Sequence, residues 1–261
     1  MASATDIKIE IRDLTMAYGS FVVMRDINVQ IKRGEIFIIM GGSGCGKSTL
    51  LRHMIGLKQP AQGDIYYEGT PFWQSDEDAR TTKLRSFGVL FQGGALWSSM
   101  TLAENIGLVL GEYTEFPPAE IREIARLKLA LVGLKGFEDY YPAEISGGMC
   151  KRAGLARALA LDPDVLFFDE PSAGLDPISS RNLDELILQL RDSLGATFVV
   201  VTHELASIFT IADNSVFLDP NTRTMRARGN PSEMLKNSTD PAVLQFLTRG
   251  EATLHPLANP L

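Results

Sequence analysis

The feature that most constrains this sequence is a glycine-rich segment, Gly41-Gly-Ser-Gly-Cys-Gly-Lys-Ser48, which follows a run of apolar residues. Its spacing matches G-x-x-x-x-G-K-[ST] at every fixed position. Glycines allow successive backbone N–H groups to point into one concavity, and the helix expected to begin near Lys47 directs its positive end to the same place. The segment therefore predicts a phosphate-binding loop between a strand and a helix. In such a loop Lys47 reaches the β- and γ-phosphates of a nucleotide, and the Ser48 hydroxyl ligates Mg²⁺.

A nucleotide in this loop needs a metal ligand and a base on a neighbouring strand. The apolar run Val165 to Phe168 ends in two acids, Asp169 and Glu170. Asp169 is expected to hold Mg²⁺ through water, and Glu170 to polarise the attacking water as general base. His203 follows another apolar run, Thr197 to Val201. Parallel strands bring their carboxyl ends to one edge of a sheet, so His203 is expected near the γ-phosphate.

The remaining patterns alternate between strands and helices. Ile7, Ile9 and Ile11 alternate with polar residues, which is the period of a half-buried strand. Apolar residues at helical spacing fill 118–131, and a second helix is expected over 147–161. We therefore predict an α/β fold with a mixed sheet core and an inserted helical subdomain. The expected division places the core at 1–94 and 161–229, the helical subdomain at 95–160 and a C-terminal tail at 230–261.

Two shorter segments allow local predictions. In the tail, Pro231 and Pro241 are each expected to begin a short helix. Trp73 is either a contact for a partner or a side chain that packs down on the sheet. The acidic run Asp76 to Asp78 predicts a solvated turn.

Composition narrows the class of protein. The chain has 261 residues, of which 45% are hydrophobic, and a formal net charge of −7. A sizeable core is therefore possible, while an acidic balance disfavours nucleic acid as a partner. The longest run of apolar side chains, Ile36 to Met40, is far below the roughly 18 to 20 residues of a membrane span. With no secretory pattern at the N-terminus and only two cysteines, the chain is expected to be soluble and intracellular.

The segment Ser146-Gly-Gly-Met149 decides among the classes of phosphate-binding protein. It precedes an expected helix and stands 23 residues before Asp169. In this context it resembles the signature motif of ABC-type ATPases, and further motifs follow in the order typical of that family. Tyr18 resembles the aromatic residue that stacks on adenine, and Gln92 the Q-loop glutamine. Ser172-Ala-Gly-Leu-Asp176 resembles the D-loop, and His203 the switch histidine.

This resemblance implies a P-loop ABC ATPase fold, ATP and Mg²⁺ as cofactors, and a head-to-tail homodimer that holds each ATP between two subunits. The implied catalytic residues are Glu170, His203 and Gln92, and the Mg²⁺ ligands are Ser48, Gln92 and Asp169. The implied ATP-binding residues are Tyr18, Gly41, Gly42, Ser43, Gly44, Cys45, Gly46, Lys47, Ser48 and Thr49. The opposite subunit would contribute Ser146, Gly147, Gly148 and Met149, with Asp176 in the D-loop. Met149 replaces the usual glutamine, and Gly42 a frequent proline; neither position supplies a required side-chain ligand.

The stretch after Gln92 points to a branch of the family. It reads Gly-Gly-Ala-Leu-Trp97 and continues to Glu104-Asn105, which is similar to the ATPase subunit of Mla-type phospholipid transport systems of Gram-negative envelopes. The similarity implies a subunit that powers phospholipid transport between inner and outer membranes. It would sit at the cytoplasmic face of the inner membrane through an integral membrane permease, with accessory and lipid-binding subunits. The small residues of 93–95 beside Trp97 are a candidate socket for a helix of that permease.

Three alternatives remain open at this point. The first is the ATPase subunit of another ABC importer or exporter. The second is a soluble ABC ATPase that acts on nucleic acid or ribosomes, which the length and acidic charge disfavour. The third, a P-loop kinase, leaves Ser146 and His203 unexplained.

A further expectation concerns the reactivity of the two cysteines. The helix N-terminus beside Cys45 should lower the pKa of this thiol and make it more reactive than Cys150.

Overall fold

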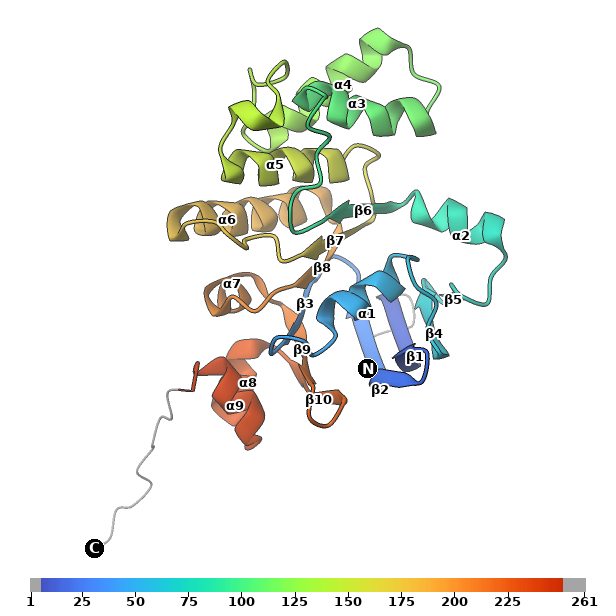
Figure 1. Ribbon diagram of the computed structural model, residues 1–261, viewed down its shortest axis with the longest axis vertical. Helices are drawn as coiled ribbons and strands as arrows, with labels where there is room; N and C mark the ends of the chain where they lie inside the picture. Colours follow the sequence, from blue (N-terminus) through green and yellow to red (C-terminus); the bar gives the residue numbers. More distant parts are fainter. Residues whose placement is uncertain (1–5, 251–261) are drawn as a thin grey trace, which may run out of the picture.

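The computed structural model describes residues 6–250, and Figure 1 shows how its strands and helices follow one another along the chain. The strands are β1 (Ile7–Tyr18), β2 (Phe21–Lys32), β3 (Ile36–Gly41), β4 (Gln62–Tyr67), β5 (Thr70–Pro71), β6 (Phe87–Leu90), β7 (Val165–Asp169), β8 (Thr197–Val201), β9 (Asn214–Asp219) and β10 (Thr224–Gly229). The helices are α1 (Lys47–Met54), α2 (Glu77–Leu84), α3 (Leu102–Tyr113), α4 (Pro118–Leu131), α5 (Gly147–Ala158), α6 (Pro177–Leu194), α7 (Leu205–Ile211), α8 (Pro231–Asn237) and α9 (Pro241–Leu247), with a 3₁₀ turn at Pro142–Glu144.

The strands form two sheets. An antiparallel sheet has the order β2-β1-β4-β5, and a six-stranded sheet has the order β10-β9-β3-β8-β7-β6. In the larger sheet β9, β3, β8, β7 and β6 run parallel, while β10 pairs antiparallel to β9. The predicted mixed-sheet α/β fold is therefore confirmed. The parallel order brings the ends of β3, β7 and β8 to one edge, where the candidate site lies.

The central strand β3 shows why its sequence is continuously apolar. All of its residues are buried. Phe37 and Ile39 pack toward the antiparallel sheet and α1, whereas Ile38 and Met40 pack toward the helices on the other face. Because alternate side chains of a strand point to opposite faces, a strand covered on both sides needs apolar residues at every position.

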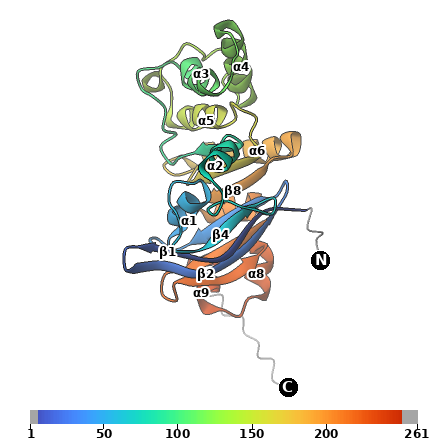
Figure 2. The same ribbon diagram turned by 90° about the vertical axis from the view of Figure 1, so that its right-hand side faces the viewer.

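Helices α3, α4 and α5 form a block at one end of the long axis, and α8 and α9 lie at the other end in both views (Figures 1 and 2). The block is joined to the core mainly through α5, which packs beside β6 and α6. Helix α3 begins with a capping box in which Thr101 and Glu104 satisfy each other's backbone N–H groups. The helix expected over 147–161 ends slightly earlier, at Ala158.

Two local predictions are confirmed and one is wrong. Helices α8 and α9 begin at Pro231 and Pro241 as predicted, and Val243 and Leu247 are buried against the core. The acidic run is exposed to solvent as expected, but it begins α2 rather than forming a turn, because the Asp76 carboxylate accepts a hydrogen bond from the Ala79 N–H and caps the helix. For Trp73 the packing alternative holds, since its indole N–H donates to the backbone oxygen of His53.

Between residues 6 and 250, no helix has the length and apolar character required to span a membrane.

Candidate nucleotide site

The predicted phosphate loop connects β3 to α1 and lines a cavity of about 910 Å³. Two glycines in it have no substitute. Gly41 has a φ of 151°, and an added Cβ would lie 2.4 Å from the Leu218 oxygen. Gly46 has a φ of 89°, and its Cβ would lie 2.9 Å from Val23 Cγ1. Close packing and positive φ therefore explain the glycines.

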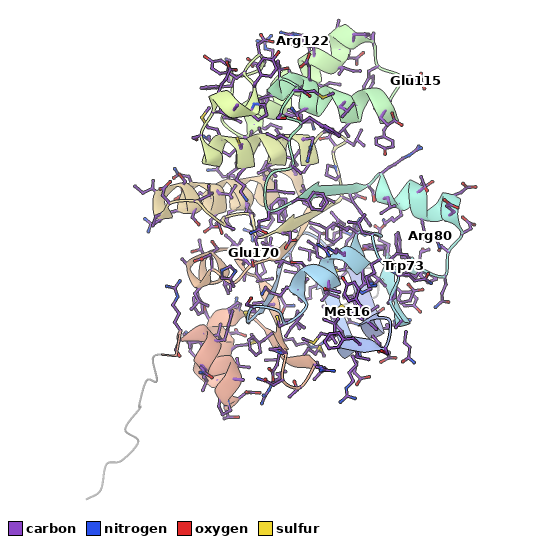
Figure 3. All side chains as sticks on the ribbon, viewed as in Figure 1. Met16, Trp73, Arg80, Glu115, Arg122 and Glu170 are labelled. Carbon is purple, nitrogen blue, oxygen red and sulfur yellow. The ribbon has the colours of Figure 1, made fainter. Side chains whose placement is uncertain are left out.

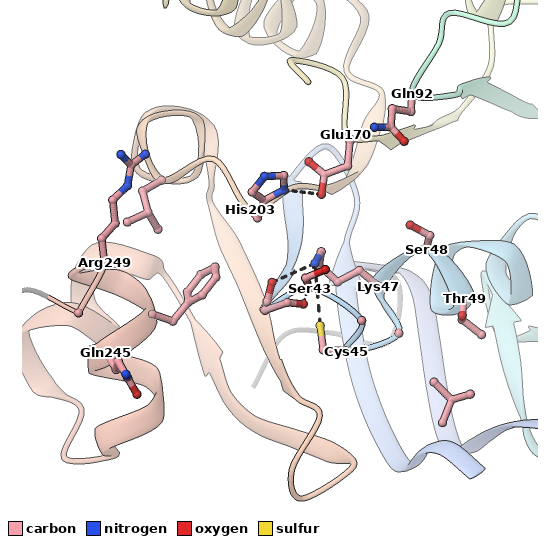
Figure 4. A pocket seen from close by; sticks show the side chains of 18 of the residues that line it. Ser43, Cys45, Lys47, Ser48, Thr49, Gln92, Glu170, His203, Gln245 and Arg249 are labelled. Atoms are coloured by element: carbon pink, nitrogen blue, oxygen red, sulfur yellow. Dashed lines mark hydrogen bonds and ion pairs between the residues drawn. The ribbon is translucent and has the colours of Figure 1, made fainter. Parts of the chain in front are cut away.

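Lys47 lies across the loop that it follows (Figure 4). Its ammonium donates to the backbone oxygens of Gly41 at 2.9 Å and Gly42 at 3.1 Å, and the side chain is buried. Both acceptors are neutral carbonyls. A phosphate oxygen in the loop would offer this ammonium a charged acceptor, and so an attraction between opposite charges that a neutral carbonyl does not supply.

Oxygen ligands suited to Mg²⁺ lie near the start of α1. The Ser48 hydroxyl donates a 2.9 Å hydrogen bond to Asp169 Oδ1, although the two residues lie 121 positions apart in the sequence. Gln92, which follows β6, lines the same cavity. A hydroxyl, a carboxylate and an amide oxygen are hard donors, and Mg²⁺ needs only a few of them beside water and phosphate. The residues present therefore fit this ion.

Glu170 and His203 face each other at the carboxyl ends of β7 and β8 (Figure 4). Nδ1 of His203 lies 2.7 Å from Oε1 of Glu170. The backbone of Glu170 has a φ of 50°, a conformation that costs energy in a residue with a side chain, and its N–H donates to the Val201 oxygen. The side chain of Glu170 is 12% exposed and that of His203 is 55% exposed. A carboxylate and an imidazole held this way can accept and relay a proton.

Tyr18 lines the cavity at the end of β1 and is 47% exposed. The ammonium of Lys58 lies 3.9 Å from the centre of its ring, which is a cation–π contact. An exposed aromatic face beside a phosphate loop can stack a nucleobase. With Tyr18, the structure brings together in one cavity all but Asp169 of the residues predicted to bind ATP and Mg²⁺ within one subunit, and Asp169 contacts that cavity through Ser48.

The signature segment and the D-loop do not line this cavity within the same chain. Ser146 caps α5 by accepting a hydrogen bond from the Met149 N–H at 3.2 Å. Asp176 caps α6, where its carboxylate accepts from the N–H groups of Ile178 and Ser179. The two caps are adjacent, because a Cβ on Gly148 would lie 3.6 Å from the Ser179 hydroxyl.

Several cavity residues were not found by sequence reasoning. They are Phe21, Val23, Leu205, Gln245, Phe246, Arg249 and Gly250. The last four belong to α9 and the residues after it, which pack beside the phosphate loop only in the folded chain. Arg249 extends toward α7, where it lies 3.7 Å from Glu204 (Figure 4). No motif marks these positions in the sequence.

The expectation for Cys45 is wrong. The thiol is 1% exposed, and burial raises its pKa, which outweighs the lowering effect of Lys47 and of the neighbouring N–H groups. The thiol packs in a buried apolar cluster, and its sulfur lies 4.0 Å from the Lys47 ammonium. Burial also raises the pKa of Cys150, whose thiol is only partly covered and lies 3.4 Å from the Pro142 oxygen.

The fold and the site together define a P-loop nucleotide-binding domain with a helical insertion. The chain belongs to the ABC transporter family, whose model matches residues 24–173. The resemblance inferred from its motifs is thereby confirmed.

Two relatives extend the similarity over most of the chain. A probable ribonucleotide transport ATP-binding protein of Mycobacterium bovis is 42% identical over 241 residues, which cover 92% of this chain and 66% of that protein. The chain thus spans just under two thirds of this longer relative. The intermembrane phospholipid transport system ATP-binding protein of Haemophilus influenzae is 40% identical over 244 residues, covering 94% of this chain and 91% of that protein.

Solved structures confirm the cassette fold. The cbiO1 protein of Clostridium perfringens, part of an ABC transporter complex, superposes with a TM-score of 0.81 at 28% identity, covering 89% of this chain and 92% of that one. A dimeric post-hydrolysis state of the ATP-binding cassette MJ0796, bound to ADP and Pi, superposes with a TM-score of 0.75 at 28% identity, covering 85% and 98%.

Proposed function

We propose that the chain is the ATP-binding and ATP-hydrolysing subunit of an ABC transporter that powers phospholipid transport between the two membranes of a Gram-negative envelope. The observation that carries the hydrolytic part is the pairing of Glu170 with His203 across the cavity from Lys47 and Ser48. The phospholipid part is supported by 40% identity over 94% of the chain to the Haemophilus relative.

In this proposal the phosphate loop binds the triphosphate, and Tyr18 stacks on the adenine. Ser48, Asp169 and Gln92 hold Mg²⁺, which neutralises charge on the phosphates when bound. Glu170 orients the attacking water and accepts its proton, while His203 holds the carboxylate and contacts the γ-phosphate. In this proposal catalysis depends on position and charge rather than on covalent chemistry.

The second half of the site comes from a second copy of the chain. Ser146, Gly147, Gly148 and Met149 form a capped helix N-terminus, which is an anion site, yet they do not line the cavity of their own subunit. A head-to-tail homodimer would bring this segment and Asp176 onto the γ-phosphate of the partner. Dimeric cassettes among the structural neighbours support the arrangement.

Coupling to transport requires an integral membrane permease at the cytoplasmic face of the inner membrane, together with accessory and lipid-binding subunits. The surface around Gly93 and Trp97 is the proposed contact, because Trp97 is 58% exposed and a Cβ on Gly93 would meet nothing within 4 Å. The domain division at 94/95, 160/161 and 229/230 is part of the same proposal, and this contact lies where the core joins the helical subdomain.

Ribonucleotide transport is the second candidate, since the name of the 42% identical mycobacterial relative states it. The two candidates differ in the transported substrate, which this subunit need not touch.

The test is to purify the tagged chain from its own membranes, identify the permease that accompanies it, and reconstitute the complex. ATP-dependent transfer of labelled phospholipid is the expected result. Transfer of ribonucleotide without phospholipid, or purification with no permease at all, would contradict the proposal.

A further inference from the structure

Helix α9 and the residues after it form part of the wall of the nucleotide cavity. Gln245 and Arg249 line this cavity together with the phosphate loop and His203. Figure 4 shows both residues on the side of the cavity away from Ser48 and Thr49. The C-terminal part of the described chain therefore faces the same cavity as the groups at the ends of β7 and β8.

The backbone that carries Arg249 is held by the core. Val243 and Leu247 of α9 are buried, and the ring centre of Phe246 lies 5.2 Å from that of Phe217 in β9. After the helix, the N–H of Arg249 donates to the Phe246 oxygen at 3.2 Å. Strand β9 is the neighbour of β3 in the sheet. These contacts therefore fix Arg249 relative to the strand that precedes the phosphate loop.

Glu204 lies between Arg249 and His203. It stands at the N-cap position of α7, where its backbone N–H donates to the Thr202 hydroxyl at 3.1 Å. Its carboxylate is directed at two other groups. Oε2 lies 3.7 Å from Nη2 of Arg249, and Oε1 lies 3.9 Å from Nε2 of His203. One carboxylate therefore connects a cation from the C-terminal residues to the imidazole in the site.

The two nitrogens of His203 differ in their surroundings. Nδ1 lies 2.7 Å from Oε1 of Glu170, so Nε2 is the nitrogen left to contact a γ-phosphate. At 3.9 Å the Glu204 carboxylate is beyond hydrogen-bond distance of Nε2, and rotation of its side chain would shorten this gap. Glu204 would then occupy Nε2 and place a negative charge beside the phosphate, which it repels. The availability of His203 therefore depends on where this carboxylate lies.

We propose that Arg249 is a positioning residue for His203 and acts through Glu204. By attracting Oε2 of Glu204, the guanidinium holds the carboxylate off Nε2 and leaves that nitrogen free for the γ-phosphate. The C-terminal residues thereby act on His203 without binding the nucleotide themselves. This inference rests on the proposed role of His203 in hydrolysis.

The first test compares Arg249→Gln and Arg249→Lys with Arg122→Gln, which removes an exposed arginine paired with Asp139 in the helical block. Turnover (kcat), KM and the affinity for a fluorescent ATP analogue are measured on the whole chain. Exposed ion pairs bias a conformation only modestly, so Arg249→Gln should lower kcat about 5-fold, with KM and affinity changed less than about 2-fold. Arg249→Lys retains the charge, so its kcat should stay within about 2-fold of the wild type, as should that of Arg122→Gln.

Removing the charge of Glu204 shows whether Arg249 acts through it. The double variant Glu204→Gln/Arg249→Gln should have the same kcat as Glu204→Gln alone, because no carboxylate is left to restrain. NMR provides a readout that does not depend on hydrolysis. The ¹⁵N signal of His203 Nε2, identified by its loss in His203→Gln, should move in Arg249→Gln as Glu204 bonds to this nitrogen. In the double variant it should lie where Glu204→Gln alone places it.

Four results would each overturn the role of Arg249. They are wild-type kcat in Arg249→Gln, an unmoved Nε2 signal in that variant, a further loss of kcat in the double variant, and a fall in affinity with kcat retained. The last would make Arg249 a direct ligand of the phosphates. Failure of the proposed function is distinguishable: unchanged hydrolysis in His203→Gln would overturn the role of His203, while the NMR comparison would still show whether Arg249 restrains Glu204.

Discussion

Asp184 in α6 accepts a 2.8 Å hydrogen bond from the hydroxyl of Ser207 in α7, and both side chains are buried. Helix α6 begins at the cap formed by Asp176, and α7 begins directly after His203 and Glu204. The bond therefore joins the helix that begins after Asp176 to the helix that follows His203. Burial raises the pKa of Asp184 to about 6, and the hydrogen bond from Ser207 only partly offsets it.

This raised pKa predicts that part of the free energy of unfolding depends on pH and is larger in acid. Since the folded pKa lies above the unfolded value of 3.8, the native state binds more protons than the unfolded state between these values. The free energy of unfolding should therefore increase as pH falls from about 7 to about 4, by up to about 3 kcal/mol from this group. Asp184→Asn should remove that component, measured as the difference between urea unfolding curves of the two proteins across pH. Equal pH slopes in both proteins would contradict the prediction.

Replacing Glu170 by Gln should remove the general base while leaving nucleotide binding in place. We expect turnover to fall on the order of 10²-fold or more, with ATP trapped in a stable dimer. Glu204→Gln is the matched control, because Glu204 lies 3.9 Å from the other nitrogen of His203 and its side chain is half-buried. Steady-state hydrolysis and size-exclusion chromatography with ATP provide the measurements. A comparable loss in Glu204→Gln would show that general charge near His203, rather than the base, is responsible.

Lys47→Ala should weaken nucleotide binding itself. The buried ammonium now bonds to carbonyls of its own loop and is the residue placed to meet phosphate. Its removal should reduce the affinity for ATP at least 10-fold, because charge-assisted bonds to the β- and γ-phosphates are lost. Equilibrium binding of a labelled ATP analogue checks this, with Lys135→Ala as control. Unaltered affinity would mean that the loop is not the phosphate site.

The permease contact can be tested at one glycine but not at its neighbour. Gly94 has a φ of 75°, and its Cβ would lie 3.2 Å from the Cys150 oxygen, so a side chain there disturbs the packing of α5. At Gly93 a Cβ meets nothing within 4 Å. Gly93→Glu should therefore abolish co-purification with the permease while the thermal midpoint and ATP affinity remain unchanged. Ser193→Glu, on the exposed end of α6, should co-purify normally. Full recovery of the permease with Gly93→Glu would place the contact elsewhere.

The two thiols should react in the order opposite to that expected from the sequence. Cys45 is almost fully buried, and Cys150 is partly exposed. Although burial raises the pKa of both, only Cys150 can be approached by a reagent without opening the loop. Maleimide labelling of the native protein should be at least 10-fold faster at Cys150, and Cys150→Ser should remove the fast phase. A fast phase that survives this change would show that Cys45 is accessible in solution.

The motif positions could be predicted because each combines local chemistry with a strand end. The glycines, Lys47 and Ser48 carry their spacing within one short loop, and Asp169 and Glu170 directly follow a buried strand. A parallel sheet brings such ends to one edge whatever the details of packing. Strands buried on both faces and helices begun by proline were predictable for the same reason, since local sequence specifies them.

Other features depend on neighbours that are distant in sequence. Whether Cys45 faces the cavity or the core depends on how the loop packs against β9, and the core side is chosen. The start of α2 depends on a capping bond that an acidic run does not reveal. Phe246 and Arg249 reach the cavity because Val243 and Leu247 dock α9 onto the core.

The sequence by itself determined which residues are candidates for the chemistry of this protein. These are the predicted phosphate loop, two acids and a histidine at strand ends, and the segment that begins α5, because residue type and spacing along the chain are enough to identify them. The tertiary structure alone decided which groups are paired, buried or left without a partner. Glu170 meets His203, and Asp184 meets Ser207, through packing between helices and sheet. Packing sums many weak contacts over the whole chain, so no single segment encodes its outcome.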